Sequence, residues 1–160
     1  MTERKEIVAA LQQIPYGLYI LTTGRGSNAN AITCNWVSQV SFEPLLVMVA
    51  VEKQSRSHQL LEAEGIFVIN VLAKEQAQLA RRMAAPHRLN PHKVARVEHR
   101  PGVTGAPVLT EAMAFLECNV HHALEAGGDH TLFVGEVIAG ALLQAGEPLT
   151  LRAAGLHYNR

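Results

Sequence analysis

The sequence of 160 residues has no surplus of either charge, few cysteines and few aromatic residues. Its 14 basic residues balance 14 acidic ones, and aromatic side chains make up 5% of the chain. Proteins that bind nucleic acids or anionic membrane surfaces neutralise phosphates with extra Lys and Arg, so the zero net charge argues against both partners. Two cysteines without CxxC spacing exclude a disulfide scaffold and favour a reduced, cytoplasmic setting.

Long hydrophobic runs are also absent. The longest run, at 45–51, has the length of a strand and falls far short of the roughly 18 residues that span a membrane. The charged start MTERKEIVAAL lacks the apolar core of a secretory signal. Hydrophobic residues still make up 48% of the chain, which excludes a disordered protein and suits a single domain over residues 1–160.

Motifs for metals and nucleophiles are missing as well. The eight histidines form no HExxH pattern and no His/Cys set at zinc spacing, so we expect no metal site. There is also no GxSxG motif, the turn that carries the nucleophilic serine of α/β-hydrolases. Cys34 lies between Ile32 and Trp36 on an alternating apolar face, where a buried and unreactive thiol is expected.

Hydrophobic periodicity predicts three short helices and seven or eight strands. The helices are expected at 3–13, 55–64 and 74–84, and a long polar loop of the kind that forms lids or interfaces at 86–105. The strands are expected at 16–23, 31–42, 45–51, 66–72, 113–125, 131–143, 148–153 and 156–159. Sequential strands with few helical crossovers favour a mainly β fold, an antiparallel barrel.

The glycine-rich stretch GRGSNA at 24–29 imitates the fingerprint of dinucleotide-binding folds. That fingerprint requires a helix directly after it, whose amides hold a pyrophosphate. Here a strand with period-two alternation follows instead. The stretch therefore predicts a hairpin turn.

Two segments carry groups suited to a ligand. Ser55, Arg56, Ser57 and His58 stand at a predicted helix start, where hydroxyls, a guanidinium and backbone N–H groups suit a phosphate, although an ordinary serine cap is the alternative. The polar face of the 31–42 strand offers hydrogen bonds to a planar heterocycle, or else is simply solvated. The 45–51 strand has no polar alternation, so both faces should be buried, one of them against a second copy of the chain.

The stretch AITCNWVSQVSFEP at 31–44 resembles the strand–turn signature of the flavin-reductase-like FMN-binding proteins. Its surroundings agree in unbroken order: YILTT before it, then PLLVMVAV, KQSRSH and IFVINVLA, and later GDHTLFVGEV and GLHY. The resemblance covers nearly the whole chain. Trp36 and the QVSFEP stretch are most similar to the flavoredoxin-like and rubredoxin-associated branch.

The resemblance implies an antiparallel split β-barrel of Greek-key type. It also implies a homodimer that holds FMN, or FAD, near the subunit interface and reduces it with NADH or NADPH. Some members release the flavin to a partner oxygenase. The alternative is an FMN-containing electron-transfer protein reduced by a rubredoxin-like carrier, which the bulky Trp36 favours by narrowing the access of a nicotinamide.

The resemblance also assigns roles to individual positions. His130 would be the catalytic residue beside the reactive ring, and it would bind the nicotinamide substrate together with Tyr158. The flavin would be bound by Thr33, Cys34, Asn35, Trp36, Ala50, Val51, Ser55, Arg56, Ser57 and His58, with the last four at the phosphate.

Overall fold

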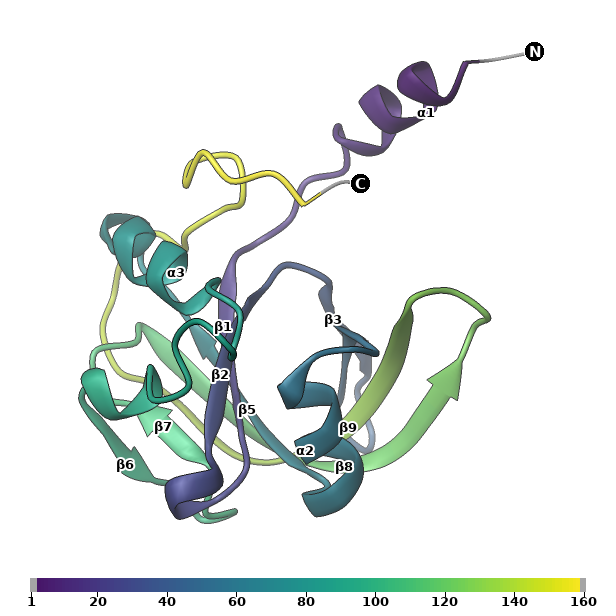
Figure 1. Cartoon of the computed structure of the whole chain (residues 1–160). Coiled ribbons are helices and arrows are strands. Elements are labelled where there is room, and N and C mark those ends of the chain that lie inside the picture. Colours follow the sequence, from purple (N-terminus) through teal and green to yellow (C-terminus); the bar gives the residue numbers. More distant parts are fainter. Residues whose placement is uncertain (1–2, 159–160) are drawn as a thin grey trace.

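The computed structural model describes residues 3–158 and is built on a seven-stranded antiparallel sheet (Figure 1). The strand order is β2-β1-β5-β8-β9-β4-β3, and a separate small sheet pairs β6 with β7. The bounds are β1 Tyr19–Thr23, β2 Asn30–Cys34, β3 Val37–Ser41, β4 Leu46–Glu52, β5 Ile66–Val71, β6 His99–Pro101, β7 Pro107–Leu109, β8 Ala114–Glu125 and β9 His130–Leu142.

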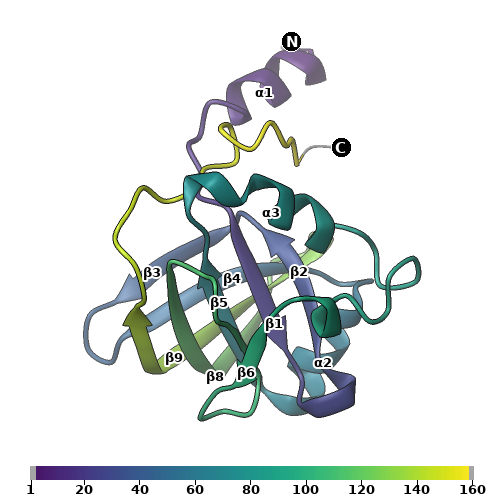
Figure 2. The ribbon, with the colours of Figure 1, turned by 90° about the vertical axis from the view of Figure 1, so that its left-hand side faces the viewer.

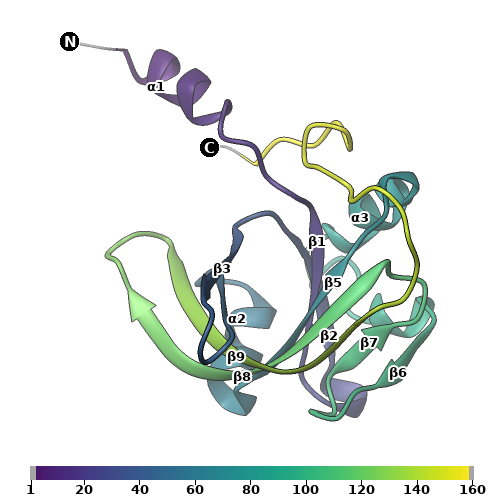
Figure 3. The same ribbon diagram turned by 180° about the vertical axis from the view of Figure 1, so that it is seen from behind.

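The sheet curls into a barrel that stays open between its two edge strands, β2 and β3 (Figure 3). These strands follow each other in the chain but stand at opposite ends of the strand order, joined by Asn35 and Trp36. Helix α2 (Arg56–Glu64) contacts both β2 and β4 and so covers the open side. The predicted antiparallel β-barrel is confirmed, in the split form that the resemblance implied.

The prediction of one continuous strand over 31–42 is wrong, because the chain changes sheet edge at Asn35 and Trp36. Before the break, β2 pairs with β1; after it, β3 pairs with β4. Of the apolar face predicted for the whole stretch, Cys34 is buried and Ile32 and Trp36 are half-buried. Beyond them, Val40 is 49% exposed and Phe42 is 86% exposed, since β3 is an edge strand with little packed against it.

The barrel interior is filled by large apolar side chains. Leu21, Phe67 and Phe133, from three different strands, are at most 1% exposed. Strand β4 alternates: its inward residues are buried and its outward ones are only partly buried. Within one copy of the chain the outward face of β4 is thus only half-buried, and its burial against a second copy stays a prediction.

Helix α2 has the ends that its sequence predicts. The Ser55 hydroxyl accepts a hydrogen bond of 3.1 Å from the backbone N–H of His58, as an N-cap does. At the other end Gly65 takes the left-handed conformation (φ 65°) and donates its N–H to the carbonyl of Leu61. A non-glycine residue in that conformation would be strained, so the glycine fixes where the helix stops.

The other two helices differ in how they pack. Helix α3 (Ala77–Met83) lies against β1 and β2, and its Leu79, Ala80 and Met83 are buried (Figure 2). Helix α1 (Arg4–Leu11) projects from the body in all three views and buries none of its residues. No helix within residues 3–158 is long and apolar enough to cross a membrane.

The hairpin of β8 and β9 matches its prediction, whereas the two short final strands do not form. Residues 148–158 run mostly as turns, with single bridges from Pro148 to Ala73 and from Thr150 to Gly17. Both bridges pair single residues in connecting segments, and the pairing does not extend into a strand on either side. Asn159, the end of the second expected strand, lies outside the described residues.

Candidate functional site

A cavity of about 720 Å³ lies where the open side of the barrel meets helix α2, the segment after α3 and the C-terminal segment 151–158. This volume lies within the usual range of small-molecule sites, roughly 300–1,000 Å³. The cavity brings together most of the residues singled out in the sequence. Those on its wall are Thr33, Cys34, Asn35, Ala50, Val51, Ser55, Arg56 and Tyr158.

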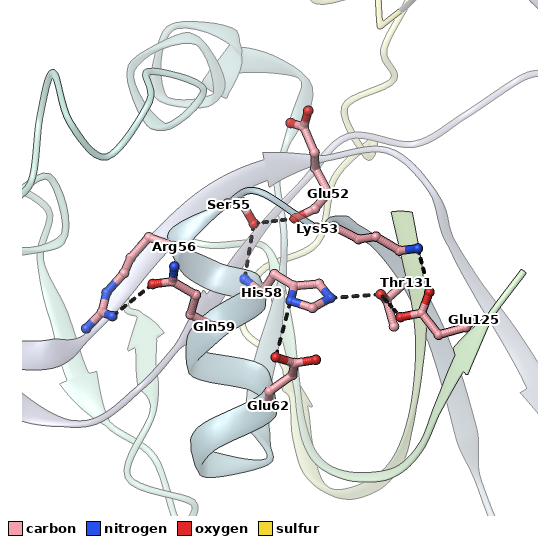
Figure 4. A network of polar contacts seen from close by, with 9 residues as sticks. All are labelled: Glu52, Lys53, Ser55, Arg56, His58, Gln59, Glu62, Glu125 and Thr131. Carbon is pink, nitrogen blue, oxygen red and sulfur yellow. Dashed lines mark hydrogen bonds and ion pairs between the residues drawn. The ribbon is translucent and has the colours of Figure 1, made fainter. Parts of the chain in front are cut away.

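One end of the cavity is the start of helix α2. The Ser55 hydroxyl donates to the carbonyl of Glu52 at 2.8 Å while it caps the helix, which fixes the first turn (Figure 4). Within the described residues, the backbone N–H groups of Arg56 and Ser57 have no acceptor. Arg56 and Gln59 also line the cavity, and the Arg56 guanidinium donates to the Gln59 amide oxygen at 3.3 Å. Free amides, a helix dipole and a guanidinium together favour an anion at this end.

The side wall is built from β2 and β4. Ala50 and Val51 present small apolar groups, while Asn35 adds an amide at the end of β2. The hydroxyl of Thr33 donates to the carbonyl of Ala80, so this side chain ties β2 to α3. Burial raises the pKa of the Cys34 thiol to about 12, which keeps it protonated and unreactive at neutral pH.

Neither Ser57 nor His58 lines the cavity. The Ser57 hydroxyl accepts from the Asn30 amide at 3.0 Å. The His58 ring nitrogen Nε2 lies 2.8 Å from the Thr131 hydroxyl on β9, which in turn donates to Glu125 at 2.9 Å (Figure 4). Because Thr131 donates to Glu125, it accepts from the His58 N–H. Both side chains therefore pin helix α2 to the barrel, and any contact of this pair with a ligand falls to the Ser57 backbone.

The Glu125 carboxylate accepts hydrogen bonds from Lys53 and Thr131 in this network. They lower the pKa of the Glu125 carboxyl, the bond from Lys53 being the larger cause, so the group accepts as a carboxylate. The backbone N–H of Lys53 also donates to the carbonyl of Asp129 at 3.0 Å. The β8–β9 turn is thus attached to the segment that leads into helix α2.

His130, Trp36 and Tyr158 form an aromatic cluster at the other end of the cavity. The ring centroid of Trp36 lies 4.7 Å from that of His130 and 5.1 Å from that of Tyr158. The Tyr158 hydroxyl lies 2.8 Å from His130 Nε2. Only Tyr158 of the three lines the cavity.

The sequence did not single out the wall formed by residues 84–88, directly after helix α3. His87 and Arg88 add cationic or polar groups there, and burial together with the charge of Arg56 lowers the pKa of His87. Lys93 braces this wall from behind: it is 1% exposed, and its ammonium donates to the carbonyls of Met83 (2.8 Å) and Ala85 (2.6 Å). No pattern in the surrounding sequence marks Lys93 for this role, because its acceptors are backbone carbonyls that only the folded loop brings close.

Comparison with known proteins identifies the family. The sequence model of the Flavin reductase like domain matches residues 11–159. The chain belongs to this family. The recognition made from the 31–44 stretch is therefore confirmed, and the split barrel is the fold of this flavin reductase-like chain.

Relatives of this family member include proteins of different architecture. It is 36% identical to the putative diflavin flavoprotein A 2 of Synechocystis sp., over 96% of this chain and 27% of the relative. It is 33% identical to the high molecular weight rubredoxin of Moorella thermoacetica, over 88% of this chain and 62% of the relative. The chain therefore spans about a quarter of the length of the diflavin flavoprotein and about three fifths of the length of the rubredoxin.

A solved structure matches the chain over most of both lengths. The NADH:FAD oxidoreductase SgcE6 of Streptomyces globisporus superposes with a TM-score of 0.83 at 35% identity, covering 93% of this chain and 89% of SgcE6. The flavin reductase-like chain thus shares both sequence and fold with an enzyme that acts on a nicotinamide and a flavin.

Proposed function

We propose that this chain binds FMN in the cavity and catalyses its reduction by NADH or NADPH, with FAD as the alternative flavin. The observation that carries the proposal is the cavity of about 720 Å³, which joins a small apolar wall to the cationic start of helix α2. FMN has the same two parts, a flat ring system and a phosphate with about two negative charges. The similarity to SgcE6 supports the same activity.

The residues of the chain would divide the work of binding. The amides of Arg56 and Ser57 and the Arg56 guanidinium would hold the phosphate. Ala50 and Val51 leave room for a flat ring, and the Asn35 amide would meet its polar edge. When bound, the flavin itself supplies the chemistry, accepting a hydride from the nicotinamide. The protein therefore needs no nucleophile, in keeping with the protonated Cys34.

Binding of FMN can be tested at Arg56. Fluorescence titration of FMN should give an affinity that falls about tenfold or more in Arg56→Gln, because a charge-assisted contact to phosphate is removed. Arg82→Gln, exposed on α3 and away from the cavity, is the matched control and should bind as the wild type does. Equal affinities in all three proteins would refute the phosphate assignment.

Reduction is a separate step and has its own measurement. Anaerobic addition of NADH or NADPH to the FMN-loaded protein should bleach the flavin absorbance. Bleaching by a reduced rubredoxin, with no response to either nucleotide, would instead support the second candidate, an electron-transfer protein. That candidate rests on the similarity to the high molecular weight rubredoxin and on the indole of Trp36 at the same end of the cavity as Tyr158.

We further propose a homodimer in the cytoplasm, with reduced flavin delivered to a partner oxygenase or electrons exchanged with a rubredoxin-like carrier. The dimer is supported by apolar side chains that remain exposed around the β3–β4 turn and on β9. These are Val40, Phe42, Leu45 and Ile138. A second copy covering this patch would remove it from water. Light scattering at micromolar concentration measures the mass, and a monomer would contradict the dimer.

A further inference from the structure

A second, smaller cavity of about 360 Å³, the side cavity, adjoins the first at the start of helix α2. Its walls are the turn at 27–29, between β1 and β2, the Arg56 side chain, and three residues of the loop after α3, namely His87, Pro91 and His92. The glycine-rich stretch at 24–29 therefore lines a cavity after all, although it does so as a turn and without the helix of a dinucleotide fingerprint.

Arg56 and His87 line both cavities, whereas Ser27, Asn28 and His92 line only the side cavity. Arg56 is also the residue whose guanidinium and backbone amide stand at the anion end of the first cavity. The side cavity thus begins where a phosphate held at that end would stop. A group bonded to the far side of that phosphate would enter the side cavity past Arg56 and His87.

The side cavity suits a longer anion than one phosphate. Among the described residues that line it are a guanidinium and two imidazoles, and none carries a carboxylate. Burial, together with the charges of Arg56, Lys93 and His92, lowers the pKa of His87, because positive groups crowd around this ring. A second phosphate placed here would offset that repulsion.

The remaining groups of the side cavity are free to bind a polar ligand. Within residues 3–158, the Ser27 hydroxyl, the Asn28 amide and the His92 ring make no hydrogen bond to the protein, and all three residues are exposed. A hydroxyl and an amide can each donate and accept, which suits the hydroxyls of a sugar. An imidazole ring offers a flat face and a polar edge to a base.

The position of His87 is fixed by the elements around it. Its Nδ1 lies 3.3 Å from the side-chain oxygen of Asn30 on β2, and the Asn30 amide donates to Ser57 of helix α2 at 3.0 Å. Behind the loop, the buried Lys93 ammonium donates to the carbonyl of Ala85. The junction between the two cavities is therefore built from β2, α2 and the braced loop together.

We propose that the side cavity binds the adenylate half of FAD, and that this chain consequently binds FAD more tightly than FMN. The inference rests on the proposed function and names the flavin that the site prefers. FAD is FMN extended by an adenylate through its phosphate, so its diphosphate would lie at Arg56 and His87, where the cavities meet. Its ribose and adenine would occupy the space lined by Ser27, Asn28 and His92.

The adenylate of a nicotinamide dinucleotide is the competing occupant, and the shared residues favour FAD over it. The second phosphate of FAD is bonded to the first, so one arginine at the junction can serve both. A nicotinamide dinucleotide would instead have to bring its own phosphates beside an arginine that the phosphate of the flavin already occupies. Like charges at that distance would repel.

Calorimetry of the wild-type protein with FMN and with FAD is the first test. We expect the Kd of FAD to be about tenfold lower than that of FMN, the gain from one or two added hydrogen bonds. Asn28→Asp places a carboxylate in the side cavity without a change of shape, and it should lower the preference for FAD at least about fivefold. Asn119→Asp, exposed on β8 and outside both cavities, is the matched control and should leave the preference unchanged.

The outcomes separate this inference from the proposed function. If the wild type binds FMN and FAD equally well, the inference is overturned and the proposed function stands. A preference for FAD that Asn28→Asp leaves intact would put the adenylate elsewhere and would also overturn it. If the wild type takes up neither flavin, the proposed function fails first, and this inference with it.

A second variant keeps the test valid if Asn28→Asp does not fold. His92→Asn removes the imidazole but keeps a polar side chain, and the preference for FAD should fall about three- to tenfold. His122→Asn, exposed on β8, is its control. The Kd of NADP⁺ for the FMN-loaded protein should be the same in His92→Asn and in the wild type. A loss of NADP⁺ affinity with the FAD preference intact would assign the side cavity to the nicotinamide dinucleotide and overturn the inference.

Discussion

The two ends of the cavity are built in different ways. At one end, the start of helix α2 is joined to the barrel by buried hydrogen bonds from Ser57 to Asn30 and from His58 to Thr131. At the other end, the C-terminal segment is anchored in the core by Leu149 and Ala154, but Tyr158 at its end is 42% exposed. The first end is held by buried side-chain hydrogen bonds, whereas the second ends in a side chain that lies outside the core.

This difference indicates how binding and stability are distributed over the site. A change at the α2 end should affect folding and ligand binding together, because the same hydrogen bonds serve both. A change at the Tyr158 end should affect binding of the second ligand and leave folding nearly untouched. Three substitutions probe this contrast.

Thr131→Val should have the largest effect on stability. The substitution keeps the shape of the side chain but leaves the buried N–H of His58 without its acceptor, at a cost of about 1–3 kcal/mol in the free energy of unfolding. Urea denaturation measures the loss. Thr131→Ser should recover most of it, and Thr110→Val, at an exposed threonine, should cost far less. Equal losses at Thr131 and Thr110 would contradict the network.

Ser55→Ala should have an intermediate effect. It removes the side-chain cap of helix α2, which costs about 1 kcal/mol of unfolding free energy, and it loosens the amides proposed to hold the phosphate. Urea denaturation and FMN titration should therefore both change. Ser38→Ala, exposed on β3, is the control that should change neither. A loss of stability with FMN affinity intact would separate the cap from the binding site.

Tyr158→Phe should have the smallest effect on stability, within about 0.5 kcal/mol, as expected for an exposed side chain outside the core. Urea denaturation of the flavin-free protein is the measurement. A loss as large as that of Thr131→Val would remove the contrast between the two ends, since Tyr158 would then stabilise the fold as much as Thr131 does.

The same contrast explains how much the sequence alone could predict. Ser55 and Gly65 mark the ends of helix α2 through local hydrogen bonds and backbone conformation, and β8 and β9 pair across a short turn. Such features depend on neighbours in the chain, so periodicity and capping rules find them. The barrel and the α2 end of the cavity followed from these rules and from the resemblance.

Other features depend on residues that are distant in the chain. The strand break at Asn35 and Trp36 arises because the two halves pair with different strands, while period-two alternation continues through it. The place of His130 behind Tyr158 and the brace from Lys93 to the end of α3 likewise need the assembled fold. No local pattern encodes them.

Lys93 gives the cavity a charge that no ligand would touch. Burial lowers the pKa of its ammonium to about 8, against an ordinary value of 10.5. At neutral pH the group is therefore still a cation, set behind the wall that carries His87 and Arg88, and its field adds to those of Arg56 and Arg88 at the anion end. In mildly alkaline solution this contribution fades while both arginines stay charged, so the attraction for a doubly charged phosphate weakens without any change in the groups that bind it.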